Sequence, residues 1–222
     1  MTETTQDGSA RTSSTRHQGL DRDDVVDAAL ELVERGGGDA LTMRKLAAEL
    51  GVSPTTIYWH IGNRDELVLA VVRRQAERQA TTRVRGRSAQ ERVSSAARNI
   101  WRNALAHRNV TALATQAGAT TLLELPLETT LVAELEVAGV RGVAARDALR
   151  SILAVIAGFL VLTWRRDDVP DELHPATLWA QVDDDRLSSQ TLTALKGRSD
   201  PDKLFERTMR SVVEGILADV DR

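Results

Sequence analysis

The residues best suited to chemistry lie together, between positions 55 and 60. The chain's single tyrosine, Tyr58, is followed by Trp59 and His60, and Thr55 and Thr56 precede it. Hydroxyl groups and ring N–H groups can donate hydrogen bonds to phosphate oxygens, while ring faces and methyl groups can contact thymine methyls. This combination predicts contact with duplex DNA. The alternative is that Tyr58 and Trp59 pack against neighbouring helices.

Two short helices are expected to position these residues. Helix-capping residues occur at four points in this part of the chain, at Asp21, Thr42, Ser53 and Asn63. Gly51 can end the helix that Thr42 begins, and Pro54 can occupy the first turn of the next helix, where its missing N–H group costs nothing. Only a tight turn fits between Gly51 and Ser53, so the two helices must cross at a steep angle. The pattern predicts a helix-turn-helix.

The spacing of apolar residues indicates which side of each helix faces inward. Ile57 and Ile61 lie four positions apart and can face Leu46 and Leu50. The hydroxyl and ring side chains of residues 55–60 then lie mostly on the outward sides. Because a soluble protein rarely exposes tyrosine and tryptophan together without a partner, this arrangement favours DNA contact over packing.

The composition is that of a globular chain without redox or thiolate chemistry. Its 222 residues, 42% of them hydrophobic and 27% charged, suffice for one large or two small domains. The net charge is −3, so DNA must be bound through a local site and not through an overall positive charge. Cysteine is absent, which excludes disulfides, thiolate metal sites and cysteine nucleophiles. No metal or cofactor is expected.

Two segments bear on the location of the protein. Residues 1–19 are rich in serine and threonine and lack the apolar core of a secretory signal, so we expect a flexible arm and a cytoplasmic protein. The apolar stretch at 151–164 has 14 residues, fewer than the roughly 20 that span a bilayer. It is predicted to be a buried helix and not a membrane span.

The last third of the chain carries more apolar surface than one subunit can cover. A helix expected at about 143–166 is apolar on nearly every side between Ile152 and Leu162, and a terminal helix that begins at Asp200 and Pro201 carries a broad apolar stripe. Two such helices from each of two subunits can form a four-helix interface. The residues expected in this homodimer interface are Ala154, Gly158, Met209, Val213, Ile216 and Leu217. Burial within a larger monomeric core is the alternative.

The region from about 89 to 139 is predicted to enclose a pocket for a small molecule. An apolar cavity needs a few polar groups to orient its ligand. The residues expected to line it are Trp101, Asn103, His107, Thr115, Gln116, Leu127 and Leu131. The alternative for each of them is packing in the core.

The segment "LTMRKLAAELGVSPTTIYWHIGNRDELVLAV", residues 41–71, resembles the DNA-binding segment of the tetracycline-repressor (TetR) family. The resemblance implies an all-α fold in three parts: the arm at 1–19, a three-helix DNA-binding domain at 20–65, and a larger helical ligand-binding and dimerisation domain at 66–222. It also implies a transcriptional regulator, most simply a repressor that binds a palindromic operator in double-stranded DNA as a homodimer and is released by a small-molecule effector. An activator of the same fold is an alternative.

The resemblance also implies roles for individual residues. The residues implied to contact bases or thymine methyls are Arg44, Pro54, Thr55, Tyr58 and Trp59. Those implied to hold phosphates are Thr42, Thr56, Tyr58, His60 and Arg64. In one respect the chain departs from the family: no histidine occurs between Asn109 and Leu173, where a repressor of metal-chelated tetracycline is expected to supply one. Tetracycline itself is therefore not the expected effector.

Catalysis is not expected. The sequence contains no G-x-S-x-G, Walker A or G-x-G-x-x-G motif, and its four histidines include no pair four residues apart. A helical enzyme is the alternative from a different functional class.

Overall fold

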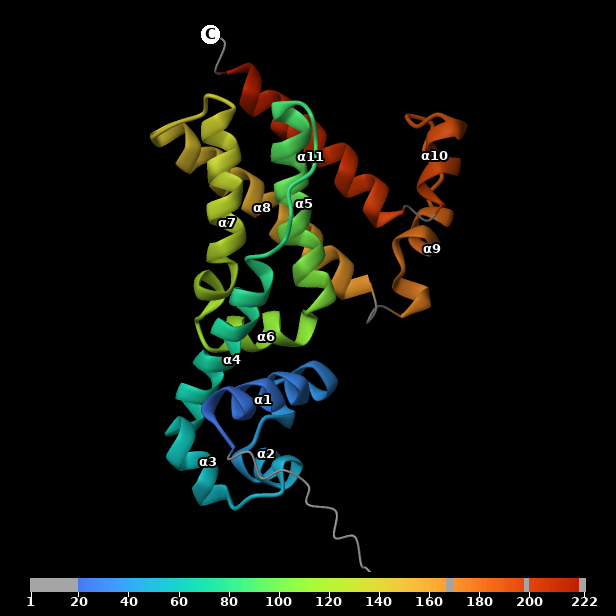
Figure 1. The fold of residues 1–222 in the computed structure, drawn as a ribbon. Coiled ribbons are helices and arrows are strands. Elements are labelled where there is room, and N and C mark those ends of the chain that lie inside the picture. Colours follow the sequence, from blue (N-terminus) through green and yellow to red (C-terminus); the bar gives the residue numbers. More distant parts are fainter. Residues whose placement is uncertain (1–19, 167–169, 198–199, 220–222) are drawn as a thin grey trace, which may run out of the picture.

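The computed structural model describes residues 20–166, 170–197 and 200–219, and the predicted arm at 1–19 lies outside these ranges. Every regular element in the described ranges is a helix, so the predicted all-α fold is confirmed (Figure 1). The N-terminal elements are α1 (Arg22–Gly36), the 3-10 turn η1 (Gly38–Ala40), α2 (Met43–Leu50), α3 (Pro54–Ile61) and α4 (Arg64–Gln79). The following elements are α5 (Ala89–Ala106), α6 (Arg108–Gln116), α7 (Thr120–Val137), α8 (Val143–Arg166), η2 (Asp171–Leu173), α9 (Pro175–Ala180), α10 (Ser189–Leu195) and α11 (Pro201–Ala218).

The four predicted helix caps are confirmed, and they fix where the first helices begin. The Thr42 hydroxyl accepts the backbone N–H of Lys45 at 3.2 Å, and the Ser53 hydroxyl accepts that of Thr56 at 3.2 Å. Asp21 and Asn63 each form a reciprocal capping box with the residue three positions on. Gly51 ends α2 in the left-handed region, at φ 67° and ψ 29°, where glycine carries no steric cost. These contacts produce the tight turn between α2 and α3.

One hydrophobic cluster holds the first four helices together. Ile57 of α3 and Leu46 of α2 are fully buried in it, and Leu50 packs at its edge. The N-terminal half of α4 belongs to the same cluster through residues 67–72, and α6 closes it through Val110 and Leu113. The predicted domain boundary at 65/66 therefore falls at the start of a helix that is itself part of the first core.

A second cluster joins α5, α7, α8 and α11. Trp101 of α5 is fully buried and stacks on Phe205 of α11, with ring centroids 4.0 Å apart and planes inclined by 12°. Phe159 of α8 meets Phe205 edge-on at 5.3 Å. In Figure 1, α5 and α7 stand side by side, with α8 and α11 crossing behind them. α9 and α10 stand beside this bundle and contain no buried residue.

The apolar helix α8 has the predicted bounds, Val143–Arg166, and so extends beyond the apolar stretch at 151–164. Its segment Val143–Trp164 has 22 residues and a mean hydropathy of 1.7, long and apolar enough by length and composition to cross a membrane, a test that core helices of soluble proteins also pass. The expectation of a buried helix holds for one face only. Ile152, Ile156 and Leu160 are buried in the second cluster, whereas Val161 and Leu162 are 46% and 63% exposed.

The contrast between Trp101 and Trp59 gives a matched test of this packing. Trp101→Ala removes a fully buried ring from its stack on Phe205, so we expect it to lower the free energy of unfolding by about 3–5 kcal/mol. Trp59→Ala removes the same side chain from a position that is 81% exposed, and we expect a change within about 0.5 kcal/mol. Denaturant unfolding of both variants measures the difference. Equal losses would contradict the assignment of the two rings.

Candidate DNA interface and internal cavity

The outward face of α3 carries the chain's most exposed aromatic pair among the described residues. Tyr58 is 51% exposed and Trp59 is 81% exposed, while the neighbouring Ile57 and Ile61 are buried. Trp59 touches only the edge of its neighbour His60, with ring centroids 4.7 Å apart and planes at 82°. The alternative that these rings pack against other helices is therefore wrong, because the two isoleucines already use the inward face.

The other residues implied to contact bases are also accessible to solvent. Arg44 on α2 and Pro54 and Thr55 at the start of α3 are all exposed. Of the residues implied to hold phosphates, Thr42 is exposed, whereas Thr56 and His60 are half-buried. The Thr56 hydroxyl lies 2.9 Å from that of Ser53, and Thr42 uses its own hydroxyl as a helix cap. Only the remaining hydrogen-bonding capacity of these hydroxyls is available to a phosphate.

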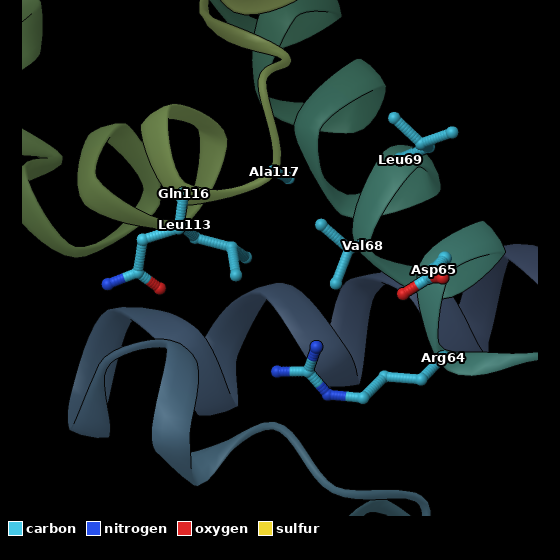
Figure 2. Close-up of a pocket in the computed structure, with 7 residues that line it drawn as sticks. All are labelled: Arg64, Asp65, Val68, Leu69, Leu113, Gln116 and Ala117. Carbon is cyan, nitrogen blue, oxygen red and sulfur yellow. The ribbon is translucent and has the colours of Figure 1, made fainter.

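The side chain of Arg64, which is implied to hold a phosphate, is directed toward the turn after α1. Its Nη2 atom lies 3.5 Å from the backbone oxygen of Gly38, at the turn that follows α1. The side chain runs along a hollow of about 390 Å³ between α4 and α6, which Figure 2 shows, with Leu113 and Gln116 on the opposite side. A phosphate contact by Arg64 thus requires the side chain to leave this position.

A set of ion pairs not foreseen from the sequence ties α4 to α1. Arg74 Nη2 lies 2.6 Å from Asp23 and its Nη1 lies 3.0 Å from Asp27, and Arg78 reaches the same Asp27 at 3.0 Å. Two of the acidic residues of α1, Asp23 and Asp27, therefore pair with α4. The signal in the sequence was the coincidence of an acid-rich helix with an arginine-rich one, although nothing in either segment fixes the pairing.

A small cavity lies where α4, α5, α6 and α7 meet. Its volume is about 10 Å³, space for about one water molecule. Two of the predicted pocket residues, Asn103 and Leu127, line it together with Gln79, Thr111 and Glu124. Gln79 and Thr111 are 96% and 95% buried, since their exposed fractions are 4% and 5%. Oγ1 of Thr111 has no hydrogen-bond partner in the described structure.

The other predicted pocket residues lie elsewhere. Trp101 and Leu131 are packed in the second hydrophobic cluster. His107 lies at the junction of α5 and α6, with its Nδ1 2.6 Å from Oε1 of Glu34 on α1. Thr115 donates to the backbone oxygen of Thr111 at 2.9 Å, and Gln116 lines the hollow of Figure 2. The structure does not bring these residues to one site.

The sequence reasoning missed two acidic residues beside the cavity. Glu124 and Glu128 lie one turn apart on α7, on either side of the buried Leu127. Burial is the largest cause that raises the pKa of Glu124, from 4.5 to about 7, and the charge and hydrogen bond of Glu128 add to it. Burial also raises the pKa of Glu128. The sequence does contain an indication of this pair, because the two acids lie four residues apart and next to leucines. The apolar stripe of the same helix gives no information about them.

The residues expected at the dimer interface divide into two groups. Ala154 and Gly158 on α8 are exposed, and a Cβ atom added at Gly158 would meet nothing within 4 Å. Met209 and Val213 on α11 are 1% and 0% exposed, so they pack the subunit's own core and leave almost no surface for a partner. Ile216 and Leu217 are half-buried. The stripe on α11 was assigned to a partner because the sequence does not reveal that α5 and α8 cover it.

The fold and the exposed face of α3 define a helix-turn-helix protein, and comparison with known proteins shows which family its N-terminal segment resembles. Residues 25–71 match the family described as "Bacterial regulatory proteins, tetR family". The chain is 50% identical over 52 residues to the tetracycline repressor protein class D of Escherichia coli, a match that covers 23% of this chain and only 24% of that protein. Residues 25–71 are therefore similar to the DNA-binding segment of the TetR family.

Similar folds among solved structures extend over nearly the whole chain. The transcriptional regulator SCO7222, a TetR from Streptomyces coelicolor, superposes with a TM-score of 0.73 at 26% identity, over 90% of this chain and 99% of that one. BioQ with its double-stranded DNA operator has a TM-score of 0.59 at 23% identity, over 90% of this chain and 99% of that one, and supports the fold alone. The family match of residues 25–71 confirms the resemblance found in the sequence of residues 41–71.

The raised pKa of Glu124 leads to a prediction about stability. The folded state holds this proton more tightly than the unfolded state does, so the stabilisation is complete below about pH 4.5 and is lost as the pH rises through about 7. Glu124→Gln should remove this loss. We expect the variant to gain about 1–2 kcal/mol over wild type on going from about pH 5 to about pH 8, after allowance for the partial exposure of the carboxyl. Denaturant unfolding at both pH values measures the gain, and a difference independent of pH would contradict the cause given.

Proposed function

We propose that the protein is a ligand-responsive transcriptional regulator, most simply a repressor, which binds duplex DNA as a homodimer. The observation that carries the proposal is the exposure of Tyr58 and Trp59 on α3, held outward by the burial of Ile57. An exposed aromatic pair of this kind marks an interaction surface. The family match of residues 25–71 and the operator complex of the structurally similar BioQ support DNA as the partner.

In this proposal α3 enters the major groove with its N-terminal end foremost. The second helix of a helix-turn-helix contacts base edges with its first residues, which here are Pro54 and Thr55, and the rings of Tyr58 and Trp59 contact thymine methyls and sugars. Arg44 reaches a base edge from α2. The phosphate contacts fall to Thr42, Thr56, Tyr58, His60 and Arg64, among which Arg64 must first leave Gly38.

The uncovered face of α8 supports a homodimer. Ala154, Gly158, Val161 and Leu162 form an exposed strip of small and apolar residues. Small residues permit close approach of a second helix, and a twofold axis places the same strip on both partners. A symmetric pair of α3 helices suits a palindromic operator, whose half-sites lie about 34–36 Å apart.

Effector control follows from the position of the cavity. Gln79, the last residue of α4, lines the cavity, and the first residues of the same helix follow α3 directly. A ligand that enlarges the cavity therefore pushes on a helix that positions the DNA-binding face. A coupling of about 1–3 kcal/mol would change operator affinity by about 5- to 150-fold.

The first test of this function concerns the division between base and phosphate contacts. Arg44→Ala should weaken binding to a selected palindrome by about 1–3 kcal/mol and relax the preference at one base pair in each half-site. His60→Ala should weaken binding to all duplexes alike, because a phosphate contact carries no sequence information. Fluorescence anisotropy on the palindrome and its single-base variants measures both effects. Arg102→Ala, an exposed arginine on α5, is the control and should change neither.

The outcome that contradicts this part of the proposal is equal affinity of the wild type for the palindrome and for random duplex at moderate salt. Unchanged sequence preference in Arg44→Ala would remove that residue from the base-contacting set.

The second test concerns the dimer. Gly158→Arg places a charge on the exposed strip of α8 without a clash inside the subunit, so we expect it to separate the subunits while leaving helix content unchanged. Light scattering measures the mass, with Glu136→Arg on the exposed side of α7 as the control. A dimer of unaltered mass and affinity in Gly158→Arg would show that the interface does not include this strip.

A further inference from the structure

The cavity between α4, α5, α6 and α7 has a polar lining that the core alone does not require. Thr111 is 95% buried, lines the cavity, and its hydroxyl oxygen has no hydrogen-bond partner in the described structure. A buried hydroxyl without a hydrogen-bond partner destabilises the folded state. Gln79 from α4 and Asn103 from α5 converge on the same space. Polar groups from three helices are therefore placed where a bound molecule can form hydrogen bonds with them.

The ionisable groups at the cavity are all acidic. Glu124 lines the cavity and Glu128 is hydrogen-bonded to it, and both belong to α7. The cavity residues contributed by α4, α5 and α6 are neutral, and none that lines the cavity is lysine, arginine or histidine. The pKa of Glu124 is raised by burial and by Glu128, and no basic neighbour is among its causes. Two carboxyl groups in one partly buried site are stabilised in their ionised form by an added positive charge.

We propose that this cavity binds a small organic cation, whose charged nitrogen lies against Glu124 and whose apolar part lies against Leu123 and Leu127. The inference rests on the proposed function in treating the cavity as the effector site. The present volume of about 10 Å³ admits about one water, so the ligand must part α4 from α6 and α7. Separating these helices displaces α4, and the proposed effector control depends on a displacement of α4.

Three probes of matched length and different charge test the inference: 4-phenylbutylamine, 4-phenylbutanol and 4-phenylbutanoate. Isothermal titration of the full chain at neutral pH should show the amine binding at least about tenfold more tightly than the other two. Glu124→Gln should lower the affinity for the amine by about tenfold and leave that for the alcohol within about twofold. This variant is expected to fold, because the substitution relieves a buried carboxyl. Glu136→Gln, an exposed acid on the same helix, is the matched control and should retain the preference.

The outcomes separate this inference from the proposed function. Failure of the amine to bind, equal binding of the three probes, or an unchanged preference in Glu124→Gln would overturn the cation site. Amine binding that leaves operator affinity unchanged would keep the cation site and overturn its role as the effector site. Weaker operator binding caused by the alcohol or the carboxylate alone would keep ligand control and overturn the cation.

Discussion

The burial of one face of α4, from Leu67 to Gln79, is the constraint on which the rest of the structure depends. Its N-terminal half, residues 67–72, belongs to the hydrophobic cluster of the first helices, and its C-terminal residues Gln75, Ala76 and Gln79 are buried against the rest of the chain. Arg74 and Arg78 join the C-terminal half of the helix to Asp27 of α1. Fifteen residue steps at 1.5 Å each make it a rod of about 22 Å. In the proposed regulator this rod transmits a displacement at the cavity to α3.

Two surfaces remain apolar because the inward faces of their helices are already occupied. On α3 the buried isoleucines face the core, and Tyr58 and Trp59 are left exposed. On α8 the buried face is formed by Ile152, Ile156 and Leu160, and Val161 and Leu162 are left exposed. Exposed apolar patches of this size usually mark partner sites. In the proposed regulator the first meets DNA and the second meets another subunit. The polar and acidic cavity differs from both, since its groups are buried without full hydrogen bonding.

What could be predicted from the sequence was local. The caps at Thr42, Ser53 and Asn63, the left-handed Gly51 and the inward spacing of Ile57 and Ile61 each depend on residues within about one helical turn, so the helix-turn-helix was predictable from composition and spacing. The exposure of Tyr58 and Trp59 followed from the same spacing. The family resemblance extended this result to the larger domain only as a helical pattern.

What could not be predicted depends on contacts between distant segments. Trp101 is buried because Phe205, more than a hundred residues later, stacks on it, and Met209 and Val213 are buried because the same helix docks on α5 and α8. The cavity gathers Gln79, Asn103, Thr111 and Glu124 from four helices. No periodicity within one helix reveals such a meeting point, and an apolar stripe looks the same whether its own subunit or a partner covers it.

In the proposed regulator two α3 helices, related by a twofold axis, bind one duplex. Hydroxyl-radical footprinting on a duplex selected from a random library tests this arrangement. We expect two protected segments of equal length, symmetric about a centre and about 34–36 Å apart along the helix axis. One protected segment, or uniform protection without symmetry, would contradict it.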